Sequence, residues 1–454
     1  MRKMARIFAG LLPDVAKWVL DRMPMLYSGA RRLRYQRAVQ QYLDEGITKN
    51  DARITMFVKF EKLNSETKRN PDPRAIQYRT PKYCVVLSQW LKPIEEELYH
   101  ISGDGKYFPS SRMIGKGLGM SERAALLHRK LKNHKNPVVL SLDVSRFDKH
   151  VSLEILEIEH LVYKLKFPND KELEQLLSWQ LHNHGTSSHG LKYVTRGRRM
   201  SGDMNTALGN CIIMILAVAS YFRFGLNGAP YDLLDDGDDC LVIVEEELVE
   251  LVKATITPYF LTLGLTLKLE GVARTMEEVV WCQSRPIEYK PGKYKFIREP
   301  SKILSHALGG PKYNIAKHRP ALLNSLGMGE LILNLGVPVL QAFAECLIRN
   351  AGTDEIVEDA DNTGSYWRVK RELKRLGLKH LQRVDPKPIT DTARHSFREA
   401  FGWSVEEQLA AEEYFSHVTI NLSGVEHQGD DFEVTSWEQF YQSLSGPDVY
   451  TWRV

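Results

Sequence analysis

The stretch LLDDGDDCLV, residues 233–242, decides the fold of this 454-residue chain. Apolar runs at 229–234 and 240–244 flank Gly237-Asp238-Asp239, a pattern that predicts a β-hairpin with this triplet in its tight turn. Glycine permits the unusual backbone angles of such a turn. Adjacent carboxylates in a segment otherwise suited to burial would repel each other unless a cation lay between them. The triplet therefore indicates a divalent-metal site. Taken alone, it is also typical of an ordinary turn, because Asp and Gly are common turn residues.

Positive charge is concentrated in the first third of the chain. Residues 1–142 contain 27 Lys+Arg and 13 Asp+Glu, which leaves 34 and 44 for the remainder, although the formal net charge is only +4. A cluster of arginines at 31, 32, 34 and 37 contributes to this excess. Such segregation favours a polyanionic partner held mainly by the N-terminal third, and its alternative is a well-solvated helical surface.

The composition indicates a large globular protein. At 43% hydrophobic residues the chain can bury a substantial core, divided into several domains or lobes. Five cysteines without short spacing indicate neither a disulfide framework nor a zinc site, which fits a reducing compartment. The longest apolar run, Cys211 to Ala219, has about half the length that spans a bilayer. We therefore expect no transmembrane segment.

Hydrophobic periodicity predicts a mixture of helices and strands. Helical patterns occupy residues 1–50, 85–99, 152–166, 203–224, 246–263 and most of the chain after 301. Strand patterns occupy residues 55–60, 137–142 and 266–269, with hairpins around Gly237 and over 279–289. These patterns predict an α+β fold.

Two further segments carry polar residues at informative positions. The strand over 137–142 ends at Asp143, and Asp148 follows where the chain turns toward a helix with Ser152 as its cap. If this strand lies beside the Gly237 hairpin, three acids converge, and such oxygen ligands suit Mg²⁺. Asp143 taken singly could instead be a helix-capping acid.

The segment SGDMNTALGN, residues 201–210, places Thr206 and Asn210 on one face of an apolar helix. These side chains either satisfy each other or face a ligand. Ser201-Gly202 before them predicts a flexible loop that could follow a sugar-phosphate backbone.

Together these segments resemble a known set of motifs. Asp143-x4-Asp148, the segment from Ser201 to Asn210, and Gly237-Asp238-Asp239 resemble motifs A, B and C of viral RNA-dependent RNA polymerases, in that order. The sequences of residues 57–62, 73–77, 145–152 and 200–210 are similar to those of the polymerases of tombusviruses and their relatives. The matching motifs cover roughly residues 30–310.

The resemblance implies a role for each matching residue. Asp143, Asp238 and Asp239 would hold Mg²⁺, for which Mn²⁺ could substitute. Asp148 and Asn210 would read the ribose 2′ hydroxyl, a group that DNA precursors lack, supported by Thr206 and by the Ser201-Gly202 loop. The remaining matches are basic residues: the incoming triphosphate would be bound by Lys59, Lys62, Arg74 and Arg79. Lys268 would protonate the departing pyrophosphate, or would be an ordinary surface lysine at a strand edge.

The fold implied by the resemblance is a right-hand polymerase with an antiparallel palm sheet and a mainly helical thumb. The expected division is an N-terminal region and fingers over 1–136, palm over 137–151 with motif A, a fingers insertion over 152–198, palm over 199–300 with motifs B to E, and a thumb with an acidic tail over 301–454. The implied activity is template-directed, two-metal transfer of nucleotides from ribonucleoside triphosphates, which replicates a positive-strand RNA virus genome. The partners would be the RNA template and product.

The resemblance also implies a location and leaves rivals open. We expect a membrane-anchoring viral replicase protein or segment outside this chain, and a place in the host-cell cytoplasm at membrane-associated replication complexes. A reverse transcriptase is the first rival, but it usually carries a bulky aromatic residue where Asp148 stands. The second alternative is an RNA-binding subunit that has lost catalytic activity. The intact Asp143, Asp238 and Asp239 argue against it.

Two groups of residues outside the motifs require separate expectations. Asp235 and Asp236 depart from the neutral residues that usually precede the Gly-Asp-Asp turn, and we expect them to be solvent-facing or salt-bridged. His182, His184 and His189 lie in a Gly/Ser-rich connection without the helix spacing of metal ligands, which predicts a solvated fingers loop.

Overall fold

The computed structural model describes residues 1–59, 73–308, 315–357, 366–422 and 451–453. Within it the chain forms two compact units. The first unit comprises residues 1–116 and 133–272, and the second comprises residues 117–132 and 273–454. Of the predicted site residues, Lys62 lies outside the described residues.

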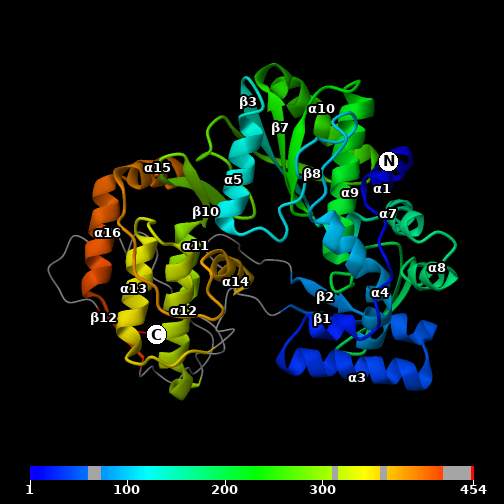
Figure 1. Ribbon diagram of the computed structural model, residues 1–454, viewed down its shortest axis with the longest axis horizontal. Helices are drawn as coiled ribbons and strands as arrows, with labels where there is room; N and C mark the ends of the chain where they lie inside the picture. Colours follow the sequence, from blue (N-terminus) through cyan, green and yellow to red (C-terminus); the bar gives the residue numbers. More distant parts are fainter. Residues whose placement is uncertain (60–72, 309–314, 358–365, 423–450, 454) are drawn as a thin grey trace. The chain divides into compact units, whose positions relative to one another are not determined.

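The first unit contains both predicted site strands and the apolar helix between them (Figure 1). Its helices are α1 (Arg2–Leu11), α2 (Arg22–Met25), α3 (Gly29–Glu45), α4 (Pro81–Leu98), α6 (Phe147–His150), α7 (Leu153–Lys166), α8 (Lys171–Ser178), α9 (Thr206–Ser220) and α10 (Val249–Thr262). Its strands are β1 (Ile54–Val58), β2 (Ala75–Tyr78), β3 (Pro137–Val144), β4 (His182–Ser187), β5 (Lys192–Arg196), β6 (Asp232–Asp235), β7 (Asp239–Glu245) and β8 (Leu267–Ala273).

The predicted hairpin is confirmed as β6 and β7, which pair antiparallel with Asp235 opposite Cys240. It belongs to a four-stranded sheet in the order β6-β7-β3-β8. Alternate residues of β3, including Leu140 and Leu142, enter the main hydrophobic core with α4, α7, α9 and α10. Because successive side chains of a strand point to opposite faces, Asp143 lies on the face away from this core.

Helix α9 forms the centre of that core. Thirteen of its fifteen residues are buried, as its composition predicts. With the following π-helical turn (Tyr221–Gly225) it forms one segment, Thr206–Gly225, that is long and apolar enough to cross a membrane, and it is the one such segment within the described residues. The apolar window of this segment is 83% buried inside the protein, so packing in the core accounts for its composition. Helix α7 begins as predicted, because the Ser152 side chain accepts a hydrogen bond from the Ile155 N–H.

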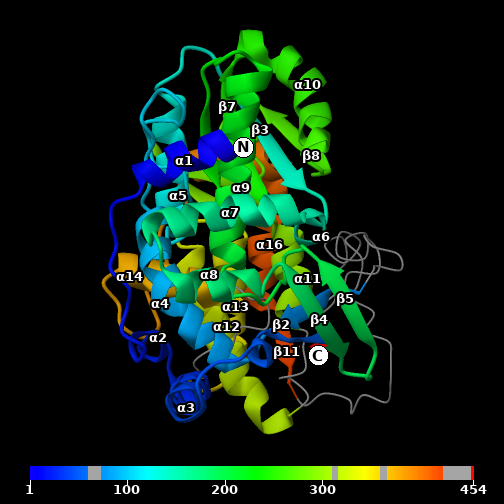
Figure 2. The same cartoon turned by 90° about the vertical axis from the view of Figure 1, so that its right-hand side faces the viewer.

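A second four-stranded sheet in this unit has the order β2-β1-β4-β5. Strand β1 pairs antiparallel with β2 and parallel with β4, and β4 and β5 form an antiparallel hairpin (Figure 2). His182 and His184 lie on the exposed face of β4, with the buried Asn183 between them. The prediction of a loop is wrong for His182 and His184, which lie in a strand, whereas His189 lies in the turn between β4 and β5. All three histidines are exposed, as expected. Within the described residues no group of three or more His, Cys, Asp or Glu side chains could hold a metal ion.

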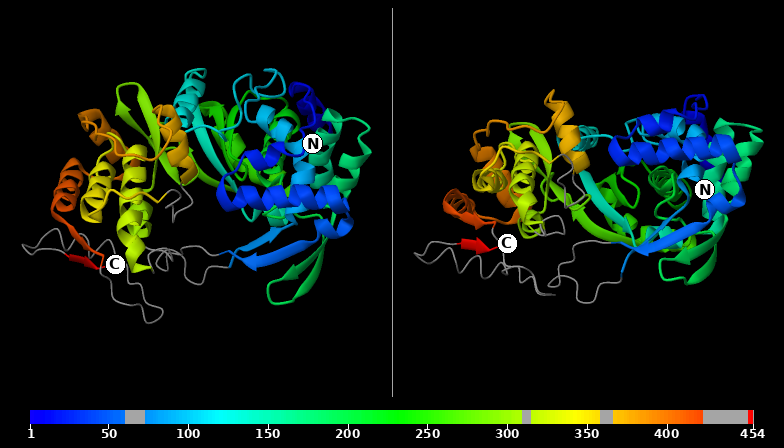
Figure 3. Two further views of the ribbon diagram at one scale, coloured as in Figure 1. Left: turned by 60° about the horizontal axis from the view of Figure 1, so that its bottom comes forward. Right: turned by 90° about the horizontal axis from the view of Figure 1, so that it is seen from below.

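The second unit is mainly helical (Figure 3, yellow to red). Its helices are α5 (Met120–Leu131), α11 (Pro300–Ala307), α12 (Arg319–Leu333), α13 (Leu340–Ala351), α14 (Tyr366–Arg375), α15 (Asp391–Phe401) and α16 (Val405–His417). Its strands are β9 (Ser284–Lys290), β10 (Lys293–Arg298), β11 (Thr419–Asn421) and β12 (Thr451–Arg453). The hairpin predicted over 279–289 is misplaced: β9 and β10 form it over 284–298, with Gly292 at a φ of +70° in the turn.

The division into units differs from the division expected from the sequence. Helix α5 and the β9–β10 hairpin belong to the second unit, whereas the sequence-based boundaries placed them in the fingers and the palm. Contacts across long sequence separations cause this grouping, since α5 packs on β10. The assignment of fingers, palm and thumb stays a prediction.

Candidate active site

The ends of two neighbouring strands bring the predicted acids together. Strands β3 and β7 pair antiparallel with Asp143 directly opposite Asp239. The Val144 N–H donates a hydrogen bond of 3.4 Å to the carbonyl oxygen of Asp238. Residues directly opposite in a ladder share a sheet face and have Cβ atoms about 4.5–5.5 Å apart. Acids almost 100 positions apart in the sequence are therefore neighbours.

A tight turn between β6 and β7 presents Asp238. The Asp236 N–H donates to the Asp239 carbonyl at 2.9 Å, which closes the turn. Gly237 has a φ of +103°, a conformation that L side chains rarely adopt. A side chain at this position would also approach Asn210, whose Cβ lies 3.5 Å from the place a Gly237 Cβ would occupy. The turn leaves the side chain of Asp238 exposed.

The three carboxylates interact electrostatically. Burial, with the nearby charges of Glu270 and Asp238, raises the pKa of Asp143 above its usual range. Burial, with the charges of Asp238 and Asp143, raises the pKa of Asp239 to about 7. Mutual repulsion of this kind is what a divalent cation would relieve, and an all-oxygen donor set fits Mg²⁺. Within the described residues these side chains do not form a group of three with the spacing of a metal site.

The raised pKa of Asp239 predicts a pH-dependent stability in metal-free protein. The folded form holds its proton up to about pH 7, while the unfolded carboxyl releases it near pH 4, so the free energy of unfolding should fall as the pH rises between these values. Chemical denaturation in the presence of a chelator measures this slope. Asp239→Asn should flatten it, and an equal slope in wild type and variant would contradict the prediction.

Asp148 and Asn210, the predicted ribose-reading pair, are joined by a hydrogen bond. The Asn210 Nδ2 donates to the Asp148 Oδ1 at 3.0 Å. Burial raises the pKa of Asp148, and the hydrogen bond from Asn210 opposes this shift. On its other side the Asn210 Oδ1 accepts a hydrogen bond of 3.2 Å from the Nε of Arg199. The pair is thus assembled before any ligand binds.

The loop before α9 is held on strand β2. The Ser201 hydroxyl accepts from the Gln77 N–H at 3.1 Å and donates to the Ala75 carbonyl at 3.2 Å, and the Gly202 N–H donates to the Gln77 carbonyl at 2.7 Å. Thr206 closes the loop through hydrogen bonds from its hydroxyl to two loop carbonyls. In this conformation the loop is held on strand β2 by hydrogen bonds, and the flexibility expected from its sequence stays a prediction.

The predicted basic residues have different environments. Lys59 and the exposed Arg74 extend the β1–β2 pair, where the Lys59 N–H donates to the Arg74 carbonyl at 2.7 Å. Lys268 is exposed on β8, and its charge acts on Asp143, which fits the expected position beside the acids. Arg79 is only 2% exposed and pairs with Asp203 at 2.6 Å.

The placement of Arg79 does not support the expected contact with a triphosphate. Its guanidinium also donates to the carbonyl of Ala52 at 2.6 Å and to the Asn183 side chain at 2.7 Å. A buried guanidinium with these partners fastens the loop before α9 to strand β4 and to the short turn before β1. Breaking such a pair is costly, which favours a structural role.

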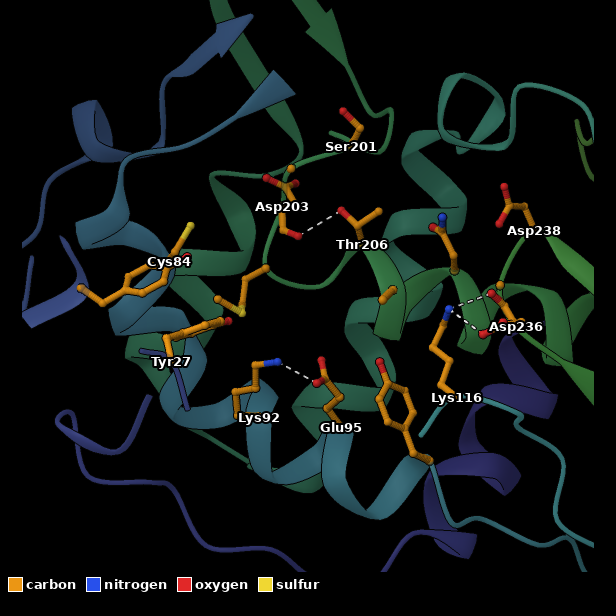
Figure 4. Close-up of a pocket in the computed structure, with 17 residues that line it drawn as sticks. Tyr27, Cys84, Lys92, Glu95, Lys116, Ser201, Asp203, Thr206, Asp236 and Asp238 are labelled. Atoms are coloured by element: carbon orange, nitrogen blue, oxygen red, sulfur yellow. Dashed lines mark hydrogen bonds and ion pairs between the residues drawn. The ribbon is translucent and has the colours of Figure 1, made fainter. Parts of the chain in front are cut away.

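A cavity of about 500 Å³ in the first unit opens beside the turn and the loop (Figure 4). One wall carries Ser201, Thr206 and Asp238, and the other carries aromatic and charged residues of α3, α4 and the connection just before α3. The Lys116 ammonium binds the carboxylate and the carbonyl of Asp236, each at 2.8 Å. In Figure 4 the Asp238 carboxylate lies apart from this ion pair. Of the acids in the turn, Asp236 is thereby neutralised and Asp238 faces the cavity.

Comparison with known proteins assigns the chain to a family. The family model described as "Viral RNA dependent RNA polymerase" matches residues 1–423. The chain belongs to this family. Among its relatives, the RNA-directed RNA polymerases of Groundnut rosette virus and Tomato bushy stunt virus are 35% and 34% identical over 408 and 420 residues, in each case 88% of this chain. The alignments cover 46% and 47% of those two proteins, so the chain spans about half the length of the curated relatives it matches.

Membership of the viral polymerase family does not explain the placement of every acidic residue near the turn. Asp235 is fully buried, and its carboxylate oxygens have no hydrogen-bond partner within the described residues. Burial raises its pKa well above the usual range. The expectation of a solvent-facing or salt-bridged acid is therefore confirmed for Asp236 and wrong for Asp235. The cause is the strand register. Asp235 pairs with β7 on one side and with residues 113–115 on the other, so it lies inside the sheet.

Several residues of this polymerase-family site were not identified from the sequence. Lys116, Glu159, Arg199 and Asp203 form the ion pairs that hold the turn, the predicted ribose-reading pair and the loop. Each partner lies 40 to 124 positions away along the chain. A periodic pattern reports only neighbours along a helix or strand, so no local signal reveals these pairs.

Proposed function

We propose that this chain carries the catalytic machinery of an RNA-directed RNA polymerase of a tombus-like positive-strand RNA virus. The observation that carries the proposal is the strand register that sets Asp143 opposite Asp239, with Asp238 presented by the adjoining turn. Membership of the viral polymerase family supports it, as does the preassembled Asp148–Asn210 pair.

In the proposed reaction a ribonucleoside triphosphate is joined to the 3′ end of a growing RNA strand. The 3′ hydroxyl gives its proton to water, and its oxygen bonds to the α-phosphorus as the bond from that phosphorus to the bridging oxygen of the β-phosphate breaks, so pyrophosphate leaves. Mg²⁺, or Mn²⁺ in its place, would be held by Asp143, Asp238 and Asp239 and would supply activation of the hydroxyl and charge stabilisation of the leaving group. Base pairing with the template selects the nucleotide.

Each remaining residue has one proposed task in this reaction. Asp148 accepts a hydrogen bond from the ribose 2′ hydroxyl, and Asn210 fixes the position of the Asp148 carboxylate. Lys268 gives a proton to the departing pyrophosphate, for which its position near Asp143 is suitable. Lys59 and Arg74 contact the triphosphate. Lys62 is assigned the same task from its sequence alone.

The proposal includes an organisation into fingers, palm and thumb. The sheet β6-β7-β3-β8 with α9 would be the palm, the sheet β2-β1-β4-β5 the fingers, and helices α11 to α16 the thumb. RNA template and product would be bound through their phosphates. We also propose that the protein works in the host-cell cytoplasm at membrane-associated replication complexes, held there by an anchoring replicase protein or segment outside this chain.

The experiment that tests this function is template-directed extension. Purified protein, a short RNA template of defined sequence and Mg²⁺ are supplied with either the four ribonucleotides or the four deoxyribonucleotides. The proposal predicts a complementary RNA product made from ribonucleotides. A product made only from deoxyribonucleotides would instead establish a reverse transcriptase, and RNA binding without any product would establish a non-catalytic RNA-binding protein.

The basic helix α3 predicts a salt-sensitive contact with RNA. Its arginines at 31, 34 and 37 are exposed, and Tyr27 and Tyr35 beside them line the cavity. Replacement of all three arginines by Gln should weaken binding of single-stranded RNA and reduce the slope of log K against log salt by up to about 2, since each phosphate contact contributes about 0.7.

Fluorescence anisotropy at several salt concentrations measures this slope. Lys253→Gln, which removes an exposed charge on α10, serves as the matched control and should leave the slope unchanged. If the triple variant kept the wild-type slope, RNA would not be held by this helix.

A further inference from the structure

A buried ion pair lies directly behind the Asp148–Asn210 pair. Arg199 and Glu159 both have side chains with no exposed surface, and a guanidinium nitrogen of Arg199 donates to the Glu159 carboxylate. Neither residue lines the cavity or contacts the three proposed metal ligands through a hydrogen bond. Burying two charges is costly, so a pair in this place calls for an explanation beyond stability.

The pair determines which way the Asn210 amide faces. Arg199 is a donor only, so the atom of Asn210 that meets its Nε must be the oxygen Oδ1, at 3.2 Å. An ionised Asp148 is an acceptor only, so the atom that meets it must be the nitrogen Nδ2, at 3.0 Å. An amide held between a pure donor and a pure acceptor has one favourable orientation. Without Arg199, rotation of the amide would turn an oxygen toward the Asp148 carboxylate.

Arg199 is in turn held in place by several groups. The Glu159 carboxylate binds it and also accepts hydrogen bonds of 2.7 Å from the Tyr163 hydroxyl and the Asn205 side chain. The backbone N–H of Arg199 donates to the Asp148 carbonyl at 3.0 Å, which links the backbone around Arg199 to the backbone around Asp148. These contacts orient the guanidinium so that its Nε points at the Asn210 Oδ1.

The sequence of α9 accommodates the ion pair. Gly209 precedes Asn210, and a Cβ at position 209 would collide with the Glu159 carboxylate and the Arg199 guanidinium. Glycine is unfavourable inside a helix relative to alanine. Its presence here allows the two charges to approach the helix backbone next to Asn210.

We propose that Arg199 and Glu159 are positioning residues for sugar selection: by fixing the Asn210 amide, they hold the Asp148 carboxylate ready for a ribose 2′ hydroxyl. This inference rests on the proposed polymerase function. It adds to that function the groups that set discrimination between ribonucleotides and deoxyribonucleotides without contacting either.

The test compares kcat/KM for ATP with kcat/KM for 2′-deoxy-ATP in Arg199→Lys, which keeps the charge but loses the directed Nε donor. The ratio should fall on the order of tenfold, mainly through a higher KM for ATP. Ile256→Val, a truncation of a fully buried residue on α10, controls for lower stability and should keep the wild-type ratio. An unchanged ratio in folded Arg199→Lys would overturn the proposal.

A double-mutant cycle separates positioning from a general loss of structure. If Arg199 acts through Asn210, Arg199→Lys should change the ratio little when Asn210 is already alanine, whereas equal effects in both backgrounds would overturn the proposal. Glu159→Gln, which keeps the shape of the side chain, gives a second route and should shift the ratio in the same direction. If neither variant folds, the pair serves folding alone and the proposal falls.

Failure of the underlying function has a different result. A wild-type protein that extends no template would refute the polymerase proposal, and the inference with it. A wild-type protein that discriminates between the sugars while the positioning variants do so equally well would refute the inference alone.

Discussion

Replacement of Asp143 or Asp238 by Asn is expected to reduce ribonucleotide incorporation by on the order of 1,000-fold or more. Asparagine keeps the size of the side chain but removes the negative charge that a divalent cation requires. The loss should appear in kcat, measured by single-nucleotide extension on a primed template. Glu250→Gln, which removes an exposed acid on α10, is the matched control and should retain full activity.

Stability measurements distinguish a catalytic from a structural loss. The charges of Asp143 and Asp238 both oppose ionisation of Asp239, so removing either should relieve repulsion in metal-free protein. The melting temperature of each variant in a chelator should therefore equal or exceed that of wild type, and Mg²⁺ should raise it less. A variant with full activity would contradict the assignment of that residue as a metal ligand.

The second large effect is expected at Asp148. Asp148→Ala removes the acceptor for the 2′ hydroxyl, and a site built to bind a hydroxyl discriminates strongly against an analogue without it. The preference for ATP over 2′-deoxy-ATP should fall by about 100-fold, and Asn210→Ala should cause a similar but smaller fall because Asp148 then loses its hydrogen bond. Measured kcat/KM values for the two nucleotides give this ratio.

Glu157→Gln provides the control for this second prediction. Glu157 lies on α7 in an exposed pair with Arg2, and its replacement should leave the preference unchanged. A wild-type preference retained in Asp148→Ala would mean that sugar selection lies elsewhere, even if polymerisation itself were demonstrated.

Local patterns in the sequence predicted the central part of the fold correctly. The Gly237 hairpin, the strand that ends at Asp143 and the helix that carries Asn210 all follow from alternation, helical periodicity and turn chemistry. The pairing of the Asp143 strand with the hairpin places the acidic residues side by side. Each of these features is encoded within about twenty residues, which is why it could be recognised.

Features that depend on distant partners could not be predicted in this way. Arg79 carries the same signal as Arg74 in the sequence, yet its pairing with Asp203 buries it in the protein. Asp235 and Asp236 are adjacent acids, and only the strand register separates a buried side chain from one paired with Lys116. The positions of Arg199 and Glu159 follow from packing between α7 and α9, for which a single sequence carries no local signal.

The central claim is that Asp143, Asp238 and Asp239 hold a divalent cation together. Electron paramagnetic resonance of Mn²⁺, titrated into the protein in the presence of RNA and a ribonucleotide, tests it without depending on turnover. The account predicts specific Mn²⁺ binding to wild type that is strongly weakened in both Asp143→Asn and Asp238→Asn but not in Glu250→Gln. Equal Mn²⁺ binding in wild type and both aspartate variants would contradict it.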